Sequence, residues 1–395
     1  MNNFTTQPQV TFWDRNVPSQ APSIEARRAF CDWKNCEHNP FYNYIGNDNA
    51  VKQLNRAAFV ALGRYNHLCN DQSFALIGPA STGKTTLARM FANTLELPFA
   101  EINGTSCSSV KEAFLQIAQA CEDYVCDDGG TLELLEHEAL DGSRGPIQFI
   151  VPPCVVFIDE VHALPKKVEQ GLLKATEKND GMMAVEIQGR VEIVDCRLVC
   201  WIIATTDRGL LFDAFDTRFE KISLNLYTLD EMAQIVQVHN PDWDFEVCEL
   251  VARFAGRVPR EALAFAKAMR SEMEMQGGDD WEEVAETVAE EKGIDSYGMT
   301  LQQIAIITAL GQGPISKSRL CSVANCKEEE LLKYVLPPML AATADQDALI
   351  RVSTKGFALT EAGAAELKKR NILYSPYLFE GKPTLSKRLD RNNLN

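Results

Sequence analysis

The hydrophobic residues in the first half of the chain form short apolar runs that alternate with longer segments of helical spacing. Strand-like runs occupy residues 74–77, 155–158 and 201–204, and helical patterns lie between them. Strands that alternate with helices are typical of an α/β domain with a mainly parallel sheet. We therefore predict such a domain over residues 41–227.

The second half of the chain has a different pattern. Residues 228–296 are helical throughout, which predicts a small helical domain, and residues 297–370 predict three helices followed by two strands. The helices are expected near 301–310, 316–324 and 328–341, and the strands at 348–353 and 356–360. This order is typical of a winged helix. Residues 1–40 are polar and predict an N-terminal arm rather than a folded unit, and residues 371–395 predict a C-terminal tail.

The composition is that of a globular protein with two or three domains. The chain has 395 residues, of which 46% are hydrophobic and 24% charged. No apolar run approaches the length that spans a membrane, and the first residues lack the regions of a signal peptide. The twelve cysteines form no C-x-x-C pair, which favours free thiols. We predict a cytoplasmic protein that does not contact a membrane.

The net charge of −16 is distributed unevenly. Residues 297–395 contain 13 Lys and Arg against 9 Asp and Glu, and the acidic excess is greatest in residues 272–295. A basic C-terminal module on an acidic body is compatible with nucleic-acid contact through that module.

The segment Gly78–Thr85 has the spacing of a phosphate-binding loop and lies between a predicted strand and a predicted helix. Glycines let backbone N–H groups face phosphates, and the helix N-terminus favours negative charge. Lys84 would contact the β- and γ-phosphates, and the Thr85 hydroxyl would bind Mg²⁺. The alternative is a glycine-rich turn with a solvated lysine. The predicted nucleotide-binding residues here are Gly78, Pro79, Ala80, Ser81, Thr82, Gly83, Lys84, Thr85 and Thr86.

Two carboxylates follow the apolar strand at 155–158. Asp159 would hold Mg²⁺, and Glu160 would orient and polarise the attacking water. An acidic pair at a strand end is only moderately specific by itself. Because the pair lies downstream of a phosphate-binding loop, we interpret it as a Walker B motif.

Polar residues after the third strand complete the candidate site. Thr205 and Thr206 end the run at 201–204, where a hydroxyl beside the carboxylates could hold the lytic water or cap a helix. Arg218 could supply positive charge to a neighbouring subunit's site, or could form a surface ion pair. Arg260 begins a predicted helix and could reach back to the phosphates.

Residues 182–194 alternate strictly and predict a β-hairpin. A two-residue loop at 188–189 would pair Val185 with Glu192, whereas a three-residue loop at 188–190 aligns apolar residues on one face. We choose the three-residue loop. The aligned residues are then Met183, Val185, Ile187, Val191 and Ile193. This face either packs on the protein's own core or docks a partner protein through Val185, Ile187, Val191 and Ile193.

The predicted winged helix carries a basic surface. It consists of Lys317, Arg319, Lys333, Arg351, Lys355, Lys368, Lys369 and Arg370. Such residues would bind DNA phosphates without reading sequence, or would be solvated charges on a structural module. Among them, Arg351 and Lys355 in the wing are the first choice for DNA contact, with Lys317 and Arg319 beside them.

The order of these motifs resembles that of the AAA+ ATPases, and more narrowly that of the RuvB family, the hexameric motor of Holliday-junction branch migration. The resemblance covers residues 41–370. The matching segments are Tyr44-Ile45-Gly46, the stretch from Phe157 to His162, Ala204-Thr205-Thr206, Gly209-Leu210-Leu211, Asp216-Thr217-Arg218-Phe219, the stretch from Gly256 to Arg260, and Gly313-Pro314-Ile315.

The resemblance implies functions for particular residues. Lys84, Thr85, Asp159 and Glu160 would form the catalytic core around ATP and Mg²⁺. The remaining assignments are Tyr44 and Ile45 beside the adenine, Thr206 as sensor 1, Arg218 as the trans-acting finger and Arg260 as sensor 2. It also implies a homo-oligomeric ring, a hexamer, that acts on duplex or four-way junction DNA. The hairpin would engage a RuvA-like junction-binding protein.

Several features depart from the family pattern. Asp207-Arg208 and Glu220 differ from the family's usual residues, and about 25 extra residues near 121–147 precede the Walker B strand. Clamp-loader subunits and origin-recognition initiators therefore stay as alternatives, as does an interaction protein that modulates another AAA+ motor. The predicted wing argues against a clamp loader, whose C-terminal part is a helical collar.

Overall fold

The computed structural model describes most of the chain in two compact units. The described residues are 23–63, 72–127, 148–177, 181–187, 189–206, 215, 217–277, 279–343 and 345–375. The sheet unit comprises the described residues up to Gly78 and those of Gly83–Leu224, and the helical unit comprises Pro79–Thr82 and the described residues from Asn225 onward. Residues 1–22, most of the extra segment at 121–147 and the tail after residue 375 lie outside the described residues.

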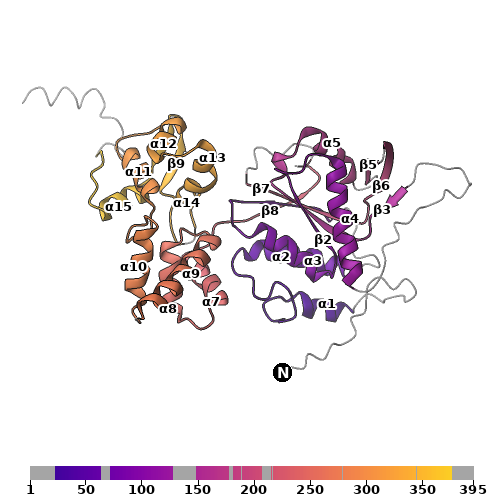
Figure 1. The fold of residues 1–395 in the computed structure, drawn as a ribbon, viewed down its shortest axis with the longest axis horizontal. Helices are drawn as coiled ribbons and strands as arrows, with labels where there is room; N and C mark the ends of the chain where they lie inside the picture. The colour runs from indigo at the N-terminus through magenta and orange to yellow at the C-terminus, as the bar shows by residue number, and fades with distance from the viewer. Residues whose placement is uncertain are drawn as a thin grey trace, which may run out of the picture. The chain divides into compact units, whose positions relative to one another are not determined.

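A five-stranded parallel sheet forms the centre of the sheet unit, with strand order β2-β4-β7-β1-β8 (Figure 1). The strands are β1 (Phe74–Ile77), β2 (Phe99–Asn103), β4 (Cys154–Asp159), β7 (Val199–Thr205) and β8 (Glu220–Ser223). Every residue of β7 is buried. Parallel strands covered on both faces need apolar side chains on both, which explains the continuous apolar runs in the sequence.

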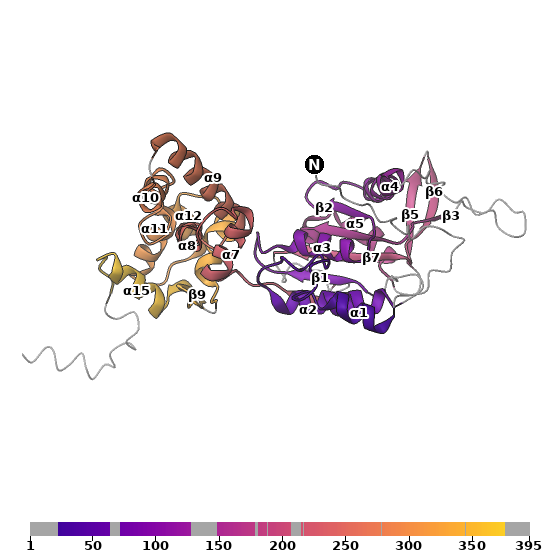
Figure 2. The same cartoon turned by 90° about the horizontal axis from the view of Figure 1, so that it is seen from below.

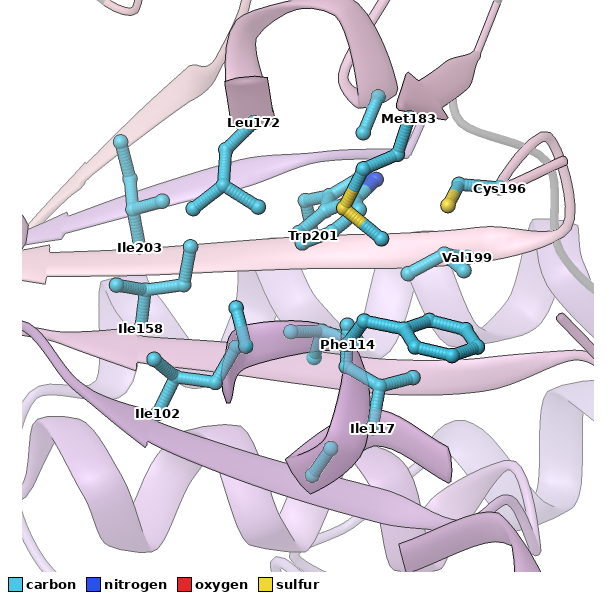
Figure 3. Close-up of a cluster of buried hydrophobic side chains, with 14 of the residues drawn as sticks. Ile102, Phe114, Ile117, Ile158, Leu172, Met183, Cys196, Val199, Trp201 and Ile203 are labelled. Carbon is cyan, nitrogen blue, oxygen red and sulfur yellow. The ribbon is translucent and has the colours of Figure 1, made fainter. Parts of the chain in front are cut away.

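Helices cover both faces of this sheet (Figure 2). Helices α2 (Asp48–Ala61) and α3 (Lys84–Thr94) share one core with the sheet, and α4 (Val110–Asp127) and α5 (Lys166–Ala175) share the other. Figure 3 shows the second core, where Trp201 of β7 lies among Leu172 of α5, Met183 of the hairpin and Phe114 of α4. The predicted α/β fold with a parallel sheet is confirmed.

The N-terminal residues differ from the expected arm, because residues 23–45 fold against α2. Helix α1 (Ile24–Cys31) begins at N-cap Ser23, and the Arg27 guanidinium donates to the Phe59 carbonyl at 3.1 Å. The buried Asn39 side chain donates to the Phe30 carbonyl at 2.6 Å and to Asn55 Oδ1 at 3.1 Å. It also accepts from the Phe41 N–H at 2.9 Å. A buried amide with these partners fixes the path of the chain.

The hairpin joins the sheet unit in a register that differs from the predicted one. Strands β5 (Met182–Ile187) and β6 (Arg190–Asp195) pair Ile187 with Arg190 and Val185 with Glu192. The loop is therefore the two-residue Gln188-Gly189, and the three-residue loop was wrong. Strand β3 (Gln148–Ile150) pairs with β6 and completes a three-stranded sheet.

This register separates the four residues that were assigned to partner docking. Met183 and Val185 face the unit's own core and are fully buried, whereas Val191 on the other face is 63% exposed and Ile193 is half-buried. The side chain of Ile187 lies outside the described residues. A one-residue slip moves every following side chain to the opposite face, so the single apolar docking face does not form.

The helical unit contains two hydrophobic cores. The first lies among α7 (Leu229–His239), α8 (Phe245–Phe254), α9 (Pro259–Gln276) and α10 (Trp281–Glu291). The second lies in the C-terminal module, which we define as residues 297–375. Its elements are α11 (Leu301–Leu310), α12 (Lys317–Ala324), α13 (Glu328–Glu330), η3 (Leu331–Val335), α14 (Pro337–Leu340), β9 (Ile350–Ser353), β10 (Gly356–Leu359) and α15 (Glu361–Lys369).

The order of elements in the C-terminal module follows the prediction of three helices and a hairpin. The predicted third helix is broken into α13, the π-helical turn η3 and α14, where Pro337 removes a backbone donor. Strands β9 and β10 are antiparallel, with Ser353 opposite Gly356. Among the residues that the structure describes, no helix has the length and apolar character needed to cross a membrane.

The folded N-terminal segment yields a test of stability. Asn39→Ala leaves the Phe30 carbonyl and the Phe41 N–H without their partner, so we expect the free energy of unfolding to fall by about 1–3 kcal/mol. Urea denaturation followed by circular dichroism measures this change. Asn35→Ala is the matched control, because Asn35 is exposed. Equal stability of the two variants would contradict a structural role for Asn39.

Candidate active site

The phosphate-binding loop connects β1 to α3. Ser81 and Gly83 have left-handed backbones, with φ of 62° and 85°, which turn the chain sharply before the helix. A Cβ at Gly78 would lie 2.6 Å from the Leu224 carbonyl oxygen, so glycine is required there. Helix α3 begins at Lys84 and Gly83 offers no side chain to cap it. The first-turn N–H groups can therefore bind an anion such as a phosphate.

Lys84 is directed back along this loop. The residue is 7% exposed, and its Nζ donates to the Gly78 carbonyl oxygen at 2.8 Å. Burial lowers the pKa of the Lys84 ammonium from its ordinary value, while the nearby Glu160 and Asp159 carboxylates oppose this shift. Lys84 begins the helix that follows β1, and β1 runs parallel to β7, the neighbour of β4, so the lysine and the acidic pair lie at the same edge of the sheet.

The backbone at the end of β4 is sharply turned. Glu160 has a left-handed conformation with φ of 48°, and its N–H donates to Asp159 Oδ1 at 3.0 Å. The Gly104 N–H donates to the Asp159 carbonyl at 2.8 Å, and a Cβ on Gly104 would lie 2.4 Å from the Glu160 carbonyl oxygen. The loop after β2 thus packs directly against the backbone of both acidic residues.

Thr206, directly after β7, and His162 of the 3₁₀ turn η1 (Val161–Ala163) hold the Glu160 carboxylate. The Thr206 hydroxyl donates to Glu160 Oε2 at 3.1 Å. His162 Nδ1 lies 3.3 Å from the same oxygen and 3.0 Å from Thr205 Oγ1. Strand β7 neighbours β4, so the sheet order brings these groups together. The sequence analysis included His162 only as part of a matching segment, and its place two residues after Glu160 was the available signal.

Arg218 binds the C-terminal end of α5 within the same chain. Its Nη2 donates to Glu177 Oε1 at 2.9 Å, and its Nη1 donates to the Leu173 carbonyl and lies 3.5 Å from Thr176 Oγ1. A cation at a helix C-terminus interacts favourably with the last carbonyls. Within a single chain, Arg218 therefore forms an ion pair, which was the alternative role predicted from the sequence.

The other predicted ligands lie in the segment before α2, in the first turn of α3 and in the first turn of α9. Tyr44 and Ile45 are half-buried in the turns before α2, and Tyr44 packs against the core beneath α2 and α3. Thr85 is half-buried and Thr86 exposed in the first turn of α3. Arg260 is exposed in the first turn of α9, in the helical unit.

The helical unit contains a cavity of about 330 Å³ that includes three residues of the phosphate-binding loop. Pro79, Ala80 and Ser81 line it together with residues of the helical part, which include Leu226, Phe254, Gly256, Val258 and Phe265. The Tyr227 hydroxyl donates to the Thr82 carbonyl at 3.1 Å beside it. A mostly apolar cavity of this size is suitable for a small organic ligand such as a nucleotide base.

The oxygen donors of the site are suitable for Mg²⁺. A carboxylate from Asp159 and a hydroxyl from Thr85 are hard ligands of the kind that Mg²⁺ takes together with phosphate oxygens. Among the described residues no group of three or more His, Cys, Asp or Glu could hold a metal by itself.

Comparisons with known proteins agree with this geometry. The model of the family described as "ATPase family associated with various cellular activities (AAA)" matches residues 74–225. The Holliday junction branch migration complex subunit RuvB of Bdellovibrio bacteriovorus is 26% identical over 333 residues, covering 81% of this chain and 90% of that protein. RuvB of Thermotoga maritima is 26% identical over 338 residues, covering 82% and 90%.

The fold is also found among solved structures. The Thermotoga maritima RuvB Holliday junction branch migration motor aligns with a TM-score of 0.60 at 23% identity, covering 84% of this chain and 97% of that one. The chain is thus similar to RuvB proteins over about four fifths of its length, and residues 74–225 match the AAA family model. The loop at Gly78–Thr85 and the acidic pair at the end of β4 both lie within the residues that match this family model.

The site geometry yields a test that separates binding from hydrolysis. Glu160→Gln removes the carboxylate that would polarise water but keeps a side chain of similar size beside Thr206. We expect ATP hydrolysis to fall by about 10²-fold or more, with ATP affinity changed little. Lys84→Ala should weaken ATP binding itself. Steady-state hydrolysis and binding of a fluorescent ATP analogue measure the two effects.

The exposed Glu220→Gln is the matched control for this pair. If Glu160→Gln hydrolyses ATP as fast as the wild type, Glu160 does not act on the attacking water.

Proposed function

We propose that this protein is an ATP-driven motor that moves duplex DNA and drives branch migration of Holliday junctions. The observation that carries the proposal is that β1, β7 and β4 are parallel neighbours, so that the loop before Lys84, the Asp159–Glu160 pair and Thr206 all lie at one edge of the sheet. The similarity to RuvB proteins over about four fifths of the chain supports the DNA substrate.

Each residue of the site has its own role in ATP hydrolysis. Lys84 binds the β- and γ-phosphates, and Thr85 and Asp159 hold Mg²⁺, which neutralises phosphate charge when bound. Glu160 orients and polarises the attacking water. Thr206 and His162 fix the Glu160 carboxylate, since both lie within 3.3 Å of Glu160 Oε2. Tyr44 and Ile45 are proposed to contact the adenine, and Arg260 to contact the phosphates.

Arg218 is proposed to complete the site of a neighbouring subunit in a homo-oligomeric ring, a hexamer. Its side chain is 28% exposed and bound to Glu177 and to the Leu173 carbonyl. Assembly would exchange these contacts for a γ-phosphate on the adjacent subunit. An arginine held near the surface by a half-exposed glutamate is accessible for such an exchange.

The DNA surface is proposed to centre on the β9–β10 hairpin. Arg351 and Lys355 are exposed there, and Arg319 is exposed on α12. Lys317 is exposed but forms an ion pair with Glu328 at 2.5 Å. Arg370 does not belong to this surface, contrary to the prediction from the sequence, because its side chain is 6% exposed and paired with Asp295 and Glu366. The side chain of Lys333 lies outside the described residues.

A RuvA-like partner is proposed to contact the outer face of the hairpin. The exposed Val191 and the half-buried Ile193 lie on that face, with the exposed Ala184 and Glu186 on the strand opposite them. Val185 is excluded from this surface because it is buried in the core.

The trans role of Arg218 can be tested with mixed subunits. Arg218→Ala should bind ATP but hydrolyse it about 10³-fold more slowly or worse. Mixing it with Lys84→Ala subunits should restore part of the activity, because each variant supplies the half-site that the other lacks. Steady-state hydrolysis at varied subunit ratios measures this.

Glu177→Gln is the matched control, because it breaks the ion pair of Arg218 within the chain and leaves the arginine in place. A loss of activity in Glu177→Gln as large as in Arg218→Ala would identify Arg218 as a structural residue of α5.

The motor function can be tested with a synthetic four-way junction. Wild-type protein with ATP should convert the junction into duplex arms. Replacing Arg351 and Lys355 together by Ala should abolish this conversion but spare hydrolysis without DNA. Each lost phosphate contact should also lower the slope of log K against log salt by about 0.9. Fluorescence anisotropy at several salt concentrations measures the slope.

The exposed Lys267→Ala on α9 is the control for the loss of a surface charge. Wild-type hydrolysis without any junction conversion would argue against a motor, and a static assembly on linear duplex in electron micrographs would favour an initiator.

A further inference from the structure

Arg257 is a buried arginine in an unusual backbone conformation. It follows Gly256 in the turn between α8 and α9, is 6% exposed and has φ of 64°. A left-handed conformation is costly for a residue with a Cβ, and a buried guanidinium is costly unless its N–H groups are paired. The surrounding structure must therefore compensate for both.

The guanidinium binds two segments that are distant in sequence. Arg257 Nη1 and Nη2 donate to the two carboxylate oxygens of Asp345, at 2.9 and 3.2 Å. Its Nε and Nη2 donate to Gln346 Oε1 at 3.2 and 2.9 Å, and Nη1 also donates to the Tyr227 carbonyl at 3.0 Å. One side chain thus joins the α8–α9 turn, the segment before α7 and the loop between α14 and β9.

Asp345 is held from several directions. Its carboxylate also accepts from the Leu229 N–H at 3.0 Å and from the Thr343 hydroxyl at 2.6 Å. Burial by itself raises the pKa of the Asp345 carboxyl, but these hydrogen bonds and the Arg257 charge outweigh it, so the pKa lies well below its ordinary value. The ion pair is therefore present throughout the neutral range.

Two further contacts lie where the four-helix part, formed by α7–α10, meets the C-terminal module. A Cβ on Gly298 would lie 2.1 Å from the Arg253 carbonyl oxygen, so the connecting segment packs directly on the end of α8. Arg370, after α15, binds Asp295 in that segment at 2.6 Å. The module is thus fixed on the four-helix part by polar contacts at two places.

The position of Arg257 connects the cavity to the hairpin. Gly256 and Val258, on either side of it, line the cavity that also includes Pro79, Ala80 and Ser81. The side chain of Arg257 leaves this wall and binds the loop that leads into β9, the strand that carries Arg351. A ligand that displaces the cavity wall would therefore move the residue that holds the loop before β9.

We propose that Arg257 is a positioning residue that couples nucleotide binding at the cavity to DNA binding by the β9–β10 hairpin, through its contacts with Asp345 and Gln346. This inference rests on the proposed function, since it takes ATP and duplex DNA as the two ligands. Coupling between two binding sites is reciprocal, so nucleotide must change DNA affinity by the same factor as DNA changes nucleotide affinity.

The test measures that factor in the full chain. Anisotropy with a fluorescent duplex gives DNA affinity with and without a non-hydrolysable ATP analogue, and the analogue's affinity is measured with and without duplex. In the wild type we expect a factor of about 5–150. Arg257→Gln and Asp345→Asn should each bring the factor close to 1, while each ligand alone binds within about threefold of the wild type.

Controls separate coupling from folding. Arg253→Gln, an exposed arginine at the end of the same α8, should keep the wild-type factor. Combining Arg257→Gln with Asp345→Asn should lower the coupling factor no further than either single variant does. The effects of residues that act as a unit are not additive. Thermal unfolding by circular dichroism checks each variant, and Asp345→Asn, which keeps its oxygen for the Leu229 N–H, gives the result if Arg257→Gln does not fold.

The outcomes distinguish this inference from the proposed function. A wild-type factor of 1, or an unchanged factor in folded Arg257→Gln and Asp345→Asn, would overturn the coupling role while ATP and DNA binding stand. Failure of the wild type to bind ATP or duplex at all would instead refute the proposed function.

Discussion

Burial of β4 between β2 and β7 is the constraint on which the candidate site depends. All three strands are parallel, with Asn103 of β2 opposite Asp159 and Ile158 opposite Ile203 of β7. Their carboxyl ends therefore meet at one edge of the sheet. The phosphate-binding loop follows β1, the acidic pair lies at the end of β4, and the two threonines lie at the end of β7, so all three groups come to this edge.

The electrostatics of this edge depend on the same burial. The low exposure of Lys84 lowers its pKa, and the Glu160 and Asp159 carboxylates partly restore it. A cation in such surroundings has lost much of its hydration, so its attraction to a phosphate is stronger than that of a solvated lysine. The hydrogen bond from Thr206 fixes the Glu160 carboxylate. Positioned groups of this kind need no rearrangement when charge develops on the reacting phosphate.

The sequence predicted the parallel sheet, the phosphate-binding loop, the acidic pair and the order of elements in the C-terminal module, because each produces a local pattern. The sequence did not predict contacts between residues that are far apart along the chain. Arg370 reaches Asp295 across 75 residues and Arg257 reaches Asp345 across 88. The hairpin register failed for a different reason. Residues on both of its faces are apolar enough to be core, so alternation could not decide which face the sheet unit buries.

Polar contacts join the four-helix part to the C-terminal module within the helical unit. The four-helix part and the C-terminal module each have their own apolar core, and the contacts that join them include an ion pair between the buried Arg257 and the partly exposed Asp345. Taking the guanidinium out of water has a desolvation cost that its partners must offset, so stability alone does not account for a buried arginine at this place. A bidentate arginine–carboxylate contact instead fixes direction as well as distance. An apolar contact at this place would let the two parts slide past each other. The contacts of Arg257 with Asp345 instead transmit a displacement of the cavity wall to the loop before β9.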